Sequence, residues 1–285
     1  MDSSAKRLVI GYQGTDGAYS QMAAERHFAQ RTAALETRGY DSFAQLLQAV
    51  IDEQIDYAMQ PIENTTAGSI NDAYDLLARL DLHLVGEEVL KVEHCLAVLP
   101  GTKLDDVRRV YSHPQALLQS SDYLAKLREC EILTFTDTAM AMRKVRDDRA
   151  PEQAAVASER AAALYGLEVL ARDIANQKSN YTRFVVAAKR PAVVPVDVPC
   201  KTSLILTTRH EQGALVRCLS VLADHKLNLT KIESRPRPNT PFEYVFYLDF
   251  EGNIADPNVA QAIERVRSHT LSFRVLGSFP ARPRS

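Results

Sequence analysis

The sequence predicts an α/β protein with a large N-terminal domain and a small C-terminal domain of ferredoxin-like fold. Strand-like and helix-like segments alternate over residues 1–190, which is typical of mostly parallel sheets covered by helices. Prolines at positions 191, 195 and 199 then interrupt the alternation, so residues 191–200 suit an extended linker. Residues 201–285 show the order βαββαβ, a split unit of the ferredoxin type. A chain of 285 residues is long enough to bury both cores.

The spacing of apolar residues predicts the first elements. Leu8–Tyr12 is a short apolar strand, and a glycine-bearing turn leads from it into a helix over 18–30. Ser42 or Asp41 can cap the next helix, whose apolar residues recur at helical spacing along one face. These are Phe43, Leu46, Leu47, Val50 and Ile51. A strand and an amphipathic helix follow, over 56–61 and 69–80.

The rest of the first domain repeats the alternation. Two extended apolar runs lie within 82–99 and end at the turn signal Pro100-Gly101. Strand–helix pairs are expected at 107–111 with 114–127, 132–135 with 139–145, and 154–157 with 159–165. The β-branched run 185–188 is a buried strand. In the second domain we expect strands at 202–208, 227–234, 244–250 and 273–279, and helices at 213–225 and 257–268.

Composition excludes several classes of function. The net charge is −2 and no long basic run occurs, which argues against a nucleic-acid partner. Cys95, Cys130, Cys200 and Cys218 are widely spaced, which argues against a zinc site or a disulfide scaffold and favours reduced thiols in the cytoplasm. The N-terminal residues lack the apolar core of a signal peptide, and no stretch approaches the length of a membrane span.

Polar residues gather where the predicted strands end, the place where α/β sheets bind ligands. Three glycines and two hydroxyls follow the first strand in Gly11–Ser20, and free amides at a helix start attract anions. Pro61–Ser69 offers an amide and several hydroxyls at another helix start, more donors than one N-cap requires. Ser112-His113-Pro114-Gln115 follows a third strand, and His113 can transfer protons near neutral pH, although a lone histidine is more often structural.

The segment Asn180–Phe184 lies at the entrance of the strand 185–188. Its amide, hydroxyl and guanidinium suit a small molecule that carries a carboxylate. The alternative interpretation is that Asn180 and Thr182 cap a turn while Arg183 pairs with a surface acid.

In order and spacing, these four segments resemble the prephenate dehydratases. Residues 201–285 resemble the ACT regulatory domain of that family, through Gly213-Ala214-Leu215-Val216 and the segment Asn228–Pro236. Asp16 and Ala67 depart from the family pattern without removing an expected contact. No chorismate mutase segment precedes the first motif, so we expect a monofunctional enzyme.

The resemblance implies a fold and an activity. The fold is a two-lobed catalytic domain of the periplasmic-binding-protein type with a cleft, lobe 1 being about 1–80 plus 178–190 and lobe 2 about 81–177. The activity is the conversion of prephenate to phenylpyruvate, inhibited by phenylalanine through the ACT domain of a homodimer or homotetramer. Loss of CO₂ and water aromatises the ring, so no cofactor or metal is expected. Arogenate dehydratase and, from another class, a non-catalytic binding protein are the alternatives.

The resemblance also implies roles for individual residues. Thr182 is the expected catalytic residue; because its hydroxyl is a poor lone acid, it donates a hydrogen bond or relays a proton from a better acid such as His113. Arg183 is expected to hold a substrate carboxylate. The expected substrate-binding set is Thr15, Ser20, Asn64, Thr65, Thr66, Ser69, Ser112, His113, Gln115, Asn180, Arg183 and Phe184. The expected phenylalanine-binding set is Gly213, Ala214, Leu215, Val216, Asn228, Leu229, Glu233, Ser234, Arg235 and Pro236.

Overall fold

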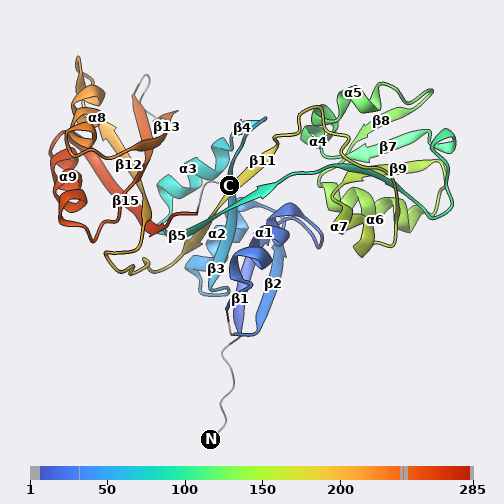
Figure 1. Ribbon diagram of the computed structural model, residues 1–285, viewed down its shortest axis with the longest axis horizontal. Helices are drawn as coiled ribbons and strands as arrows, with labels where there is room; N and C mark the ends of the chain where they lie inside the picture. The colour runs from blue at the N-terminus through green and yellow to red at the C-terminus, as the bar shows by residue number, and fades with distance from the viewer. Residues whose placement is uncertain (1–6, 32, 238–239, 241–242, 283–285) are drawn as a thin grey trace, which may run out of the picture.

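The described part of the chain forms three β-sheets, each in a separate α/β unit. The computed structural model describes residues 7–31, 33–237, 240 and 243–282. Figure 1 shows the three units in a row, with lobe 1 in the middle, lobe 2 on one side and the C-terminal domain on the other. The two-lobed α/β architecture and the ferredoxin-like domain that the sequence predicts are both confirmed.

Lobe 1 is built on a mixed sheet of strand order β2-β1-β3-β11-β5, with the short β4 paired to β3. Helix α1 packs on one face of this sheet, and α2 and α3 pack on the other. The strands are β1 (Leu8–Gln13), β2 (Leu35–Tyr40), β3 (Tyr57–Asn64), β4 (Gly68–Ser69), β5 (His83–Lys91) and β11 (Tyr181–Ala188). The helices are α1 (Tyr19–Phe28), α2 (Phe43–Ile51) and α3 (Asn71–Arg79).

Lobe 2 has a second sheet of order β10-β6-β9-β7-β8. Asp137 and Ser158 cap two of its helices by accepting hydrogen bonds from first-turn amides. In lobe 1, Ser42 caps α2 in the same way, which confirms one of the two residues predicted for this cap. The strands are β6 (Cys95–Val98), β7 (Arg109–Ser112), β8 (Glu131–Thr134), β9 (Gln153–Ala157) and β10 (Glu168–Ala171). The helices are η1 (Leu104–Asp106), α4 (Pro114–Gln119), α5 (Ser121–Leu124), α6 (Thr138–Asp148) and α7 (Glu159–Leu164).

The sequence prediction placed the first boundary between lobe 1 and lobe 2 at the wrong residue. Strand β5 pairs along its length with β11 in the lobe 1 sheet, so lobe 2 begins after residue 91 rather than at 81. The segments 92–94 and 172–180 connect the lobes, and Val92 N donates to Asn180 O at 2.8 Å between them. The sequence also did not predict the edge strands β2 and β10; β2 lacks the continuous apolar run that marks the buried strands, and the run in β10 is only three residues long.

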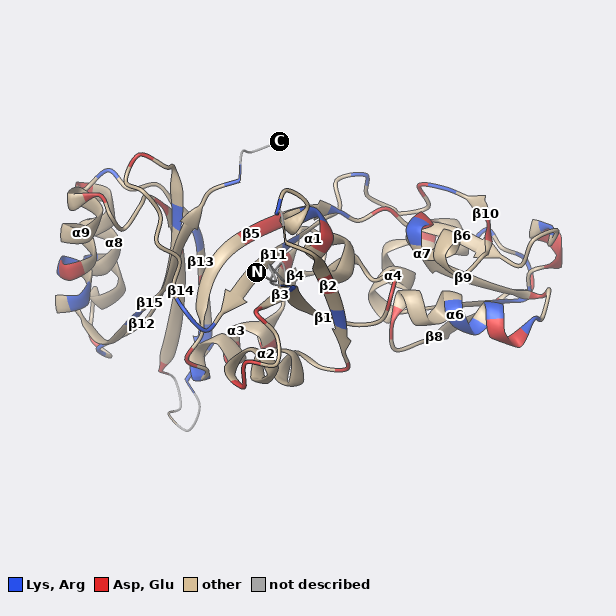
Figure 2. Ribbon diagram, turned by 90° about the horizontal axis from the view of Figure 1, so that it is seen from below, with Lys and Arg blue, Asp and Glu red and all other residues tan. Residues whose placement is uncertain are grey.

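The C-terminal domain is an antiparallel sheet of order β13-β14-β12-β15. Helices α8 and α9 cover the face turned away from lobe 1, as Figure 2 shows. The elements are β12 (Cys200–Thr208), α8 (Ala214–Asp224), β13 (Leu229–Pro236), β14 (Tyr244–Glu251), α9 (Pro257–Ser268) and β15 (Thr270–Pro280). All six match the predicted order, because each apolar run or amphipathic stretch contributes its own side of this small core.

The other face of the C-terminal sheet packs on lobe 1. Ile205 and Phe279 share one buried apolar cluster with Val185 of β11. At Gly277 the two domains approach so closely that a Cβ atom would lie 1.9 Å from Leu84 O. The two domains therefore share a core, and their relative placement is set by packing as well as by the linker. Within the described part of the chain, no helix is long and apolar enough to cross a membrane.

Candidate active site

The predicted polar segments meet where the two lobes face each other. The carboxyl ends of β1 and β3 and the start of β11 lie on the lobe 1 side, and the first turns of α4, α6 and α7 lie on the lobe 2 side. Thr15 Oγ1 donates to Asp137 Oδ1 at 3.4 Å, and Tyr165 OH donates to Asp16 O at 2.8 Å. These six elements, three from each lobe, form the boundary between the lobes, which we call the cleft.

Asn64, at the end of β3, is the centre of the hydrogen-bond network in this cleft. Its Oδ1 accepts from the backbone amides of Thr66 and Ala67, both at 2.9 Å. A backbone N–H can only donate, so these two bonds determine which end of the Asn64 side chain is oxygen. The Nδ2 group must then point the other way, and it donates to Asn180 Oδ1 at 2.8 Å and to Thr182 Oγ1 at 2.9 Å.

The orientation of Asn64 decides the role of the Thr182 hydroxyl. Thr182 pairs with Asn64 across the β3–β11 ladder and is partly exposed. Since Oγ1 accepts a hydrogen bond from Asn64, its own proton is free to donate to a molecule in the cleft. Thr182 is therefore arranged as a hydrogen-bond donor.

Gln119 and His94 belong to the same network, and the sequence did not predict a role for either. From lobe 2, Gln119 Nε2 donates to Thr66 Oγ1 at 2.5 Å, and its Oε1 accepts from Asn180 Nδ2 at 3.1 Å. His94 Nε2 lies 2.9 Å from the same Oε1. Because that oxygen accepts, His94 Nε2 carries the proton. Burial lowers the pKa of His94, so the imidazole is neutral. No motif marked these residues, because only the meeting of the lobes brings them to Asn64.

The remaining members of the predicted set on β3 and α1 surround the cleft. Thr65 Oγ1 accepts from Tyr181 N at 2.9 Å and donates to Ser179 O at 3.0 Å, which ties the second connecting segment to lobe 1. Ser20 is buried in the first turn of α1, and Thr15 is partly exposed. A cavity of about 230 Å³ lies beside the network, lined by Thr66, Gln115, Leu118, Gln119, Ser121, Ala175, Asn176, Gln177 and Asn180.

Ser112 and His113 are neighbours with different environments, one inside lobe 2 and the other at its surface. Ser112 is fully buried and donates to Val156 O at 2.6 Å, so its hydroxyl is used within the lobe 2 sheet. His113 is exposed, and its Nδ1 accepts from Gln115 N at 3.2 Å at the start of α4. Desolvation lowers the pKa of His113 although Asp137 opposes this shift. A neutral imidazole is a base at pH 7, which makes His113 a weak candidate for the proton donor.

Arg183, Ser69 and Phe184 do not lie where the sequence prediction put them. Arg183 is on the face of β11 opposite to Thr182, where its guanidinium contacts Glu63, Glu87 and Asp249. Its Nη2 atom is buried, with no partner among the described residues. These contacts do not match the predicted bond to a substrate carboxylate. Arg183 pairs with acids, as in the alternative, but Glu87 and Asp249 are buried and not at the surface.

Ser69 and Phe184 are also away from the cleft. Ser69 Oγ donates to Glu233 Oε2 at 2.5 Å, across the contact with the C-terminal domain. Phe184 is 1 % exposed in the apolar cluster under α1. The reasons differ: successive strand residues point to opposite faces, which turns Arg183 away from Thr182, whereas Phe184 lies further along the strand and packs among the apolar residues of this cluster.

The predicted phenylalanine-binding residues form two separate groups. Gly213–Val216 lie at the start of α8 and line a surface cavity of about 540 Å³ together with Tyr244 and Phe246. Gly213 has a φ of +72°, a conformation that favours glycine. Asn228, Leu229, Glu233, Ser234, Arg235 and Pro236 lie instead on or beside the edge strand β13. Arg235 Nη2 donates to Asp75 Oδ2 of α3 at 3.0 Å, so this group contacts lobe 1.

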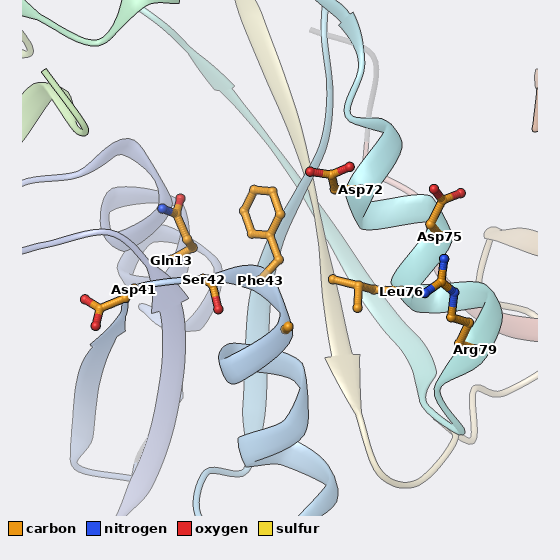
Figure 3. Close-up of a pocket in the computed structure, with 9 residues that line it drawn as sticks. Gln13, Asp41, Ser42, Phe43, Asp72, Asp75, Leu76 and Arg79 are labelled. Carbon is orange, nitrogen blue, oxygen red and sulfur yellow. The ribbon is translucent and has the colours of Figure 1, made fainter. Parts of the chain in front are cut away.

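A further cavity of about 450 Å³ lies outside the cleft, between α2 and α3. Figure 3 shows Gln13, Ser42 and Phe43 on one side of it and α3 with Asp75 and Arg79 on the other. None of Asn64, Thr182 or Gln119 lines it. Its largest group of polar residues is acidic, which does not suit an anionic ligand.

Curated relatives resemble this chain over almost its whole length. The bifunctional chorismate mutase/prephenate dehydratase of Escherichia coli K12 is 41% identical over 272 residues, which is 95% of this chain and 70% of that protein. The chloroplastic arogenate dehydratase/prephenate dehydratase 2 of Arabidopsis thaliana is 40% identical over 290 residues, or 98% of this chain and 74% of that protein.

Solved structures give the same picture, with one difference in the activity they name. Prephenate dehydratase from Arthrobacter aurescens in complex with L-Phe is 27% identical, with a TM-score of 0.87 over 96% of this chain and 90% of that one. A protein described as a novel type of quorum quenching acylase is 35% identical, with a TM-score of 0.86 over 96% and 98%. A family model described as prephenate dehydratase matches residues 10–192. The chain thus belongs to the prephenate dehydratase family.

Proposed function

We propose that this protein converts prephenate to phenylpyruvate, with release of CO₂ and water. The observation that supports this most directly is the arrangement of Asn64 and Thr182, in which Asn64 donates to Thr182 Oγ1 and leaves the Thr182 proton free. The reaction breaks the bond from the ring to the carboxylate that leaves as CO₂. The electron pair of that bond forms the new aromatic double bond as the ring hydroxyl departs with one proton as water.

Thr182 assists the departing hydroxyl in this proposal. It donates its hydrogen bond to the leaving oxygen as negative charge develops there, a contribution that strengthens in the transition state. The Gln115 amide and the N-terminus of α1 replace Arg183 as the groups that hold the substrate carboxylates, because an amide donor and a helix start both favour an anion. Asn180 and Gln119 keep Asn64 in place.

Turnover of prephenate by three proteins tests this proposal. Loss of a general acid or donor typically lowers the rate by roughly 10²–10⁴, and we expect Thr182→Ala to show a loss of that order with normal folding. Thr182→Ser, which keeps the hydroxyl, serves as the control and should retain most of the activity. Near-full turnover by Thr182→Ala would show that Thr182 is not the donor.

Two other activities are compared in the same experiment. Arogenate differs from prephenate in an amino group in place of the keto group, and the ratio of the two kcat/KM values decides between them. An acylase needs an activated nucleophile. Cys95 is a buried thiol whose pKa is raised to about 12 by burial, and Ser112 donates to a backbone carbonyl, so neither is activated. An acylase assay on the same preparation tests this alternative, and turnover in it would require a nucleophile other than these two residues.

Phenylalanine regulation is the second part of the proposal. The cavity at Gly213–Val216 combines a close backbone approach with apolar walls from Leu215 and Phe246, as an amino acid with an aromatic side chain requires. We propose that a homodimer or homotetramer brings β13 of a second subunit to this cavity, since the two predicted groups are separate within one chain and β13 is an edge strand.

Linkage provides the test of regulation. If phenylalanine inhibits through this site, it must weaken binding of a substrate analogue by the same factor by which the analogue weakens phenylalanine binding. Calorimetric titrations in both orders measure the two factors, and sedimentation measures the assembly.

We expect the cytoplasm as the compartment, in agreement with the four free thiols.

A further inference from the structure

Charged side chains from both domains meet in a buried group between lobe 1 and the C-terminal sheet. We name this group the interdomain charge cluster; it consists of Glu63, Glu87 and Arg183 from lobe 1 and Lys201, Lys231 and Asp249 from the C-terminal domain. Lobe 1 contributes two acids and one base, and the C-terminal domain contributes two bases and one acid. Figure 2 shows acidic residues of β5 in red beside this sheet.

Arg183 pairs with acids of both domains. Its Nη1 donates to Asp249 Oδ2 of β14 at 2.5 Å, and its Nε donates to Glu87 Oε2 of β5 at 2.9 Å. Arg183, Glu87 and Asp249 are 9 %, 2 % and 7 % exposed. Burial alone would lower the pKa of Arg183, but Asp249, Glu87 and Glu63 outweigh it and raise that pKa.

Such a buried pair resists separation. Removing one partner of a buried ion pair leaves an uncompensated charge in a medium of low polarity, which is strongly unfavourable. A second hydrogen bond fixes the Asp249 carboxylate, because Ser203 Oγ donates to its Oδ1 at 2.6 Å. The Arg183 guanidinium is thus bound at the same time to Glu87 of lobe 1 and to Asp249 of the C-terminal sheet, so a change in the placement of that sheet acts on this side chain.

Arg183 is also the residue next to Thr182. The two side chains leave β11 on opposite faces, Thr182 into the cleft and Arg183 toward the C-terminal domain. They pair with consecutive residues of β3, Thr182 with Asn64 and Arg183 with Glu63. The ladder register shifts directly after Arg183, where a bulge interrupts the regular pairing. A movement of the Arg183 side chain thus acts on the strand segment that positions the Thr182 hydroxyl.

We propose that Arg183 is a positioning residue, which transmits the placement of the C-terminal domain to Thr182 through its ion pair with Asp249. This rests on the proposed role of Thr182 in prephenate turnover. Asp249 does not touch the substrate, so its effect is on the geometry of the reacting groups and not on substrate binding. A displacement of about 1 Å at such a site costs up to roughly 100-fold in rate.

The first test compares Asp249→Asn with Asp75→Asn in the full-length protein. Asp249→Asn keeps the shape of the side chain and the bond to Ser203 but removes the charge that holds Arg183. We expect kcat for prephenate to fall about 10- to 100-fold with little change in KM. Asp75 of α3 also forms an interdomain ion pair, with Arg235 of β13, but this pair lies outside the interdomain charge cluster and does not involve β11. Asp75→Asn should therefore keep the wild-type kcat.

The second test repeats Asp249→Asn in a Thr182→Ala background. The Thr182→Ala background lacks the hydroxyl. If Asp249 acts through that hydroxyl, Asp249→Asn should cause no further loss, and kcat of the double variant should equal that of Thr182→Ala. A general structural effect would instead lower kcat by the same factor in both backgrounds and overturn the proposal. So would an unchanged kcat in Asp249→Asn itself.

Two measurements keep these outcomes distinct. Thermal unfolding of every variant sets an assay temperature at which all are folded. If Asp249→Asn does not fold, Arg183→Lys provides a milder change in the same ion pair, because it keeps the positive charge. Arg183→Lys should lower kcat without changing KM, because an ammonium cannot bind two acids with the geometry of the guanidinium. An inactive wild-type protein would contradict the proposed function, whereas an active wild type with an unaffected Asp249→Asn or Arg183→Lys would contradict only this inference.

Discussion

Replacing Asn64 by Asp is the sharpest perturbation of the active-site network. The two side chains have the same shape, but aspartate has an oxygen where Asn64 has Nδ2. That oxygen would face Asn180 Oδ1 at 2.8 Å, Tyr181 O at 3.1 Å and Thr182 Oγ1 at 2.9 Å. Two of these contacts become acceptor against acceptor. The third reverses, because Thr182 must now donate its proton to residue 64.

The expected sizes follow from these contacts. Two hydrogen bonds lost at about 0.5–1.5 kcal/mol each predict a loss of roughly 1–3 kcal/mol in the free energy of unfolding. With the Thr182 proton no longer available to the substrate, kcat should fall by roughly 10²–10⁴, the range for a lost general acid or donor. The fall in kcat corresponds to about 3–5 kcal/mol in the activation free energy.

Steady-state kinetics on prephenate and urea unfolding measure the two quantities. Asn253→Asp is the matched control, since Asn253 Nδ2 donates to Pro195 O at 2.7 Å and to Val198 O at 3.1 Å, far from the cleft. We expect Asn253→Asp to lose stability and to keep kcat. If Asn64→Asp turned prephenate over at a rate close to wild type, the assignment of Thr182 as a donor oriented by Asn64 would be refuted.

Two further predictions concern pH and the domain contact. Burial lowers the pKa of His94, so the folded protein binds fewer protons than the unfolded chain as the pH falls below the ordinary value of 6.5. The stability due to neutral His94 is therefore present above pH 6.5 and lost during acidification below it; His94→Gln should reduce the fall in Tm between pH 7 and pH 5, and an unchanged slope would contradict this. Gly277→Ala places a Cβ atom 1.9 Å from Leu84 O and should destabilise the protein by about 1–3 kcal/mol or more, measured by calorimetry; an unchanged Tm would show that the domains separate easily.

Much of the fold could be read from local patterns. The helix α2 has its apolar residues on one face and its cap at Ser42, both visible in the sequence. The proline-spaced stretch lies between β11 and β12, and the six elements of the C-terminal domain follow in the predicted order. Edge strand β2 was not predicted, because an edge strand in contact with solvent does not need the apolar run that buried strands require.

The site divides in the same way. Asn64 and Thr182 follow or begin strands that the sequence predicts, and a strand end is where an α/β sheet exposes its side chains. Gln119 and His94 carry no local signal, because their role comes from contact between the lobes. Arg183 was read as a ligand of the substrate from its chemistry alone, and its partners come from β3, β5 and β14.

By itself, the sequence determined the kind of protein: its alternation of apolar periods, its linker and the polar residues at its strand ends are local properties, and local properties are encoded over a few residues. Only the tertiary structure decided which side chain faces the cleft. Thr182 and Arg183 are neighbours with similar polar chemistry, yet the alternation along β11 turns one toward Asn64 and the other toward Asp249. Which face of a strand meets a cleft and which meets another domain depends on segments far away in the chain, since the two partners are 118 residues apart in the first pair and 66 in the second.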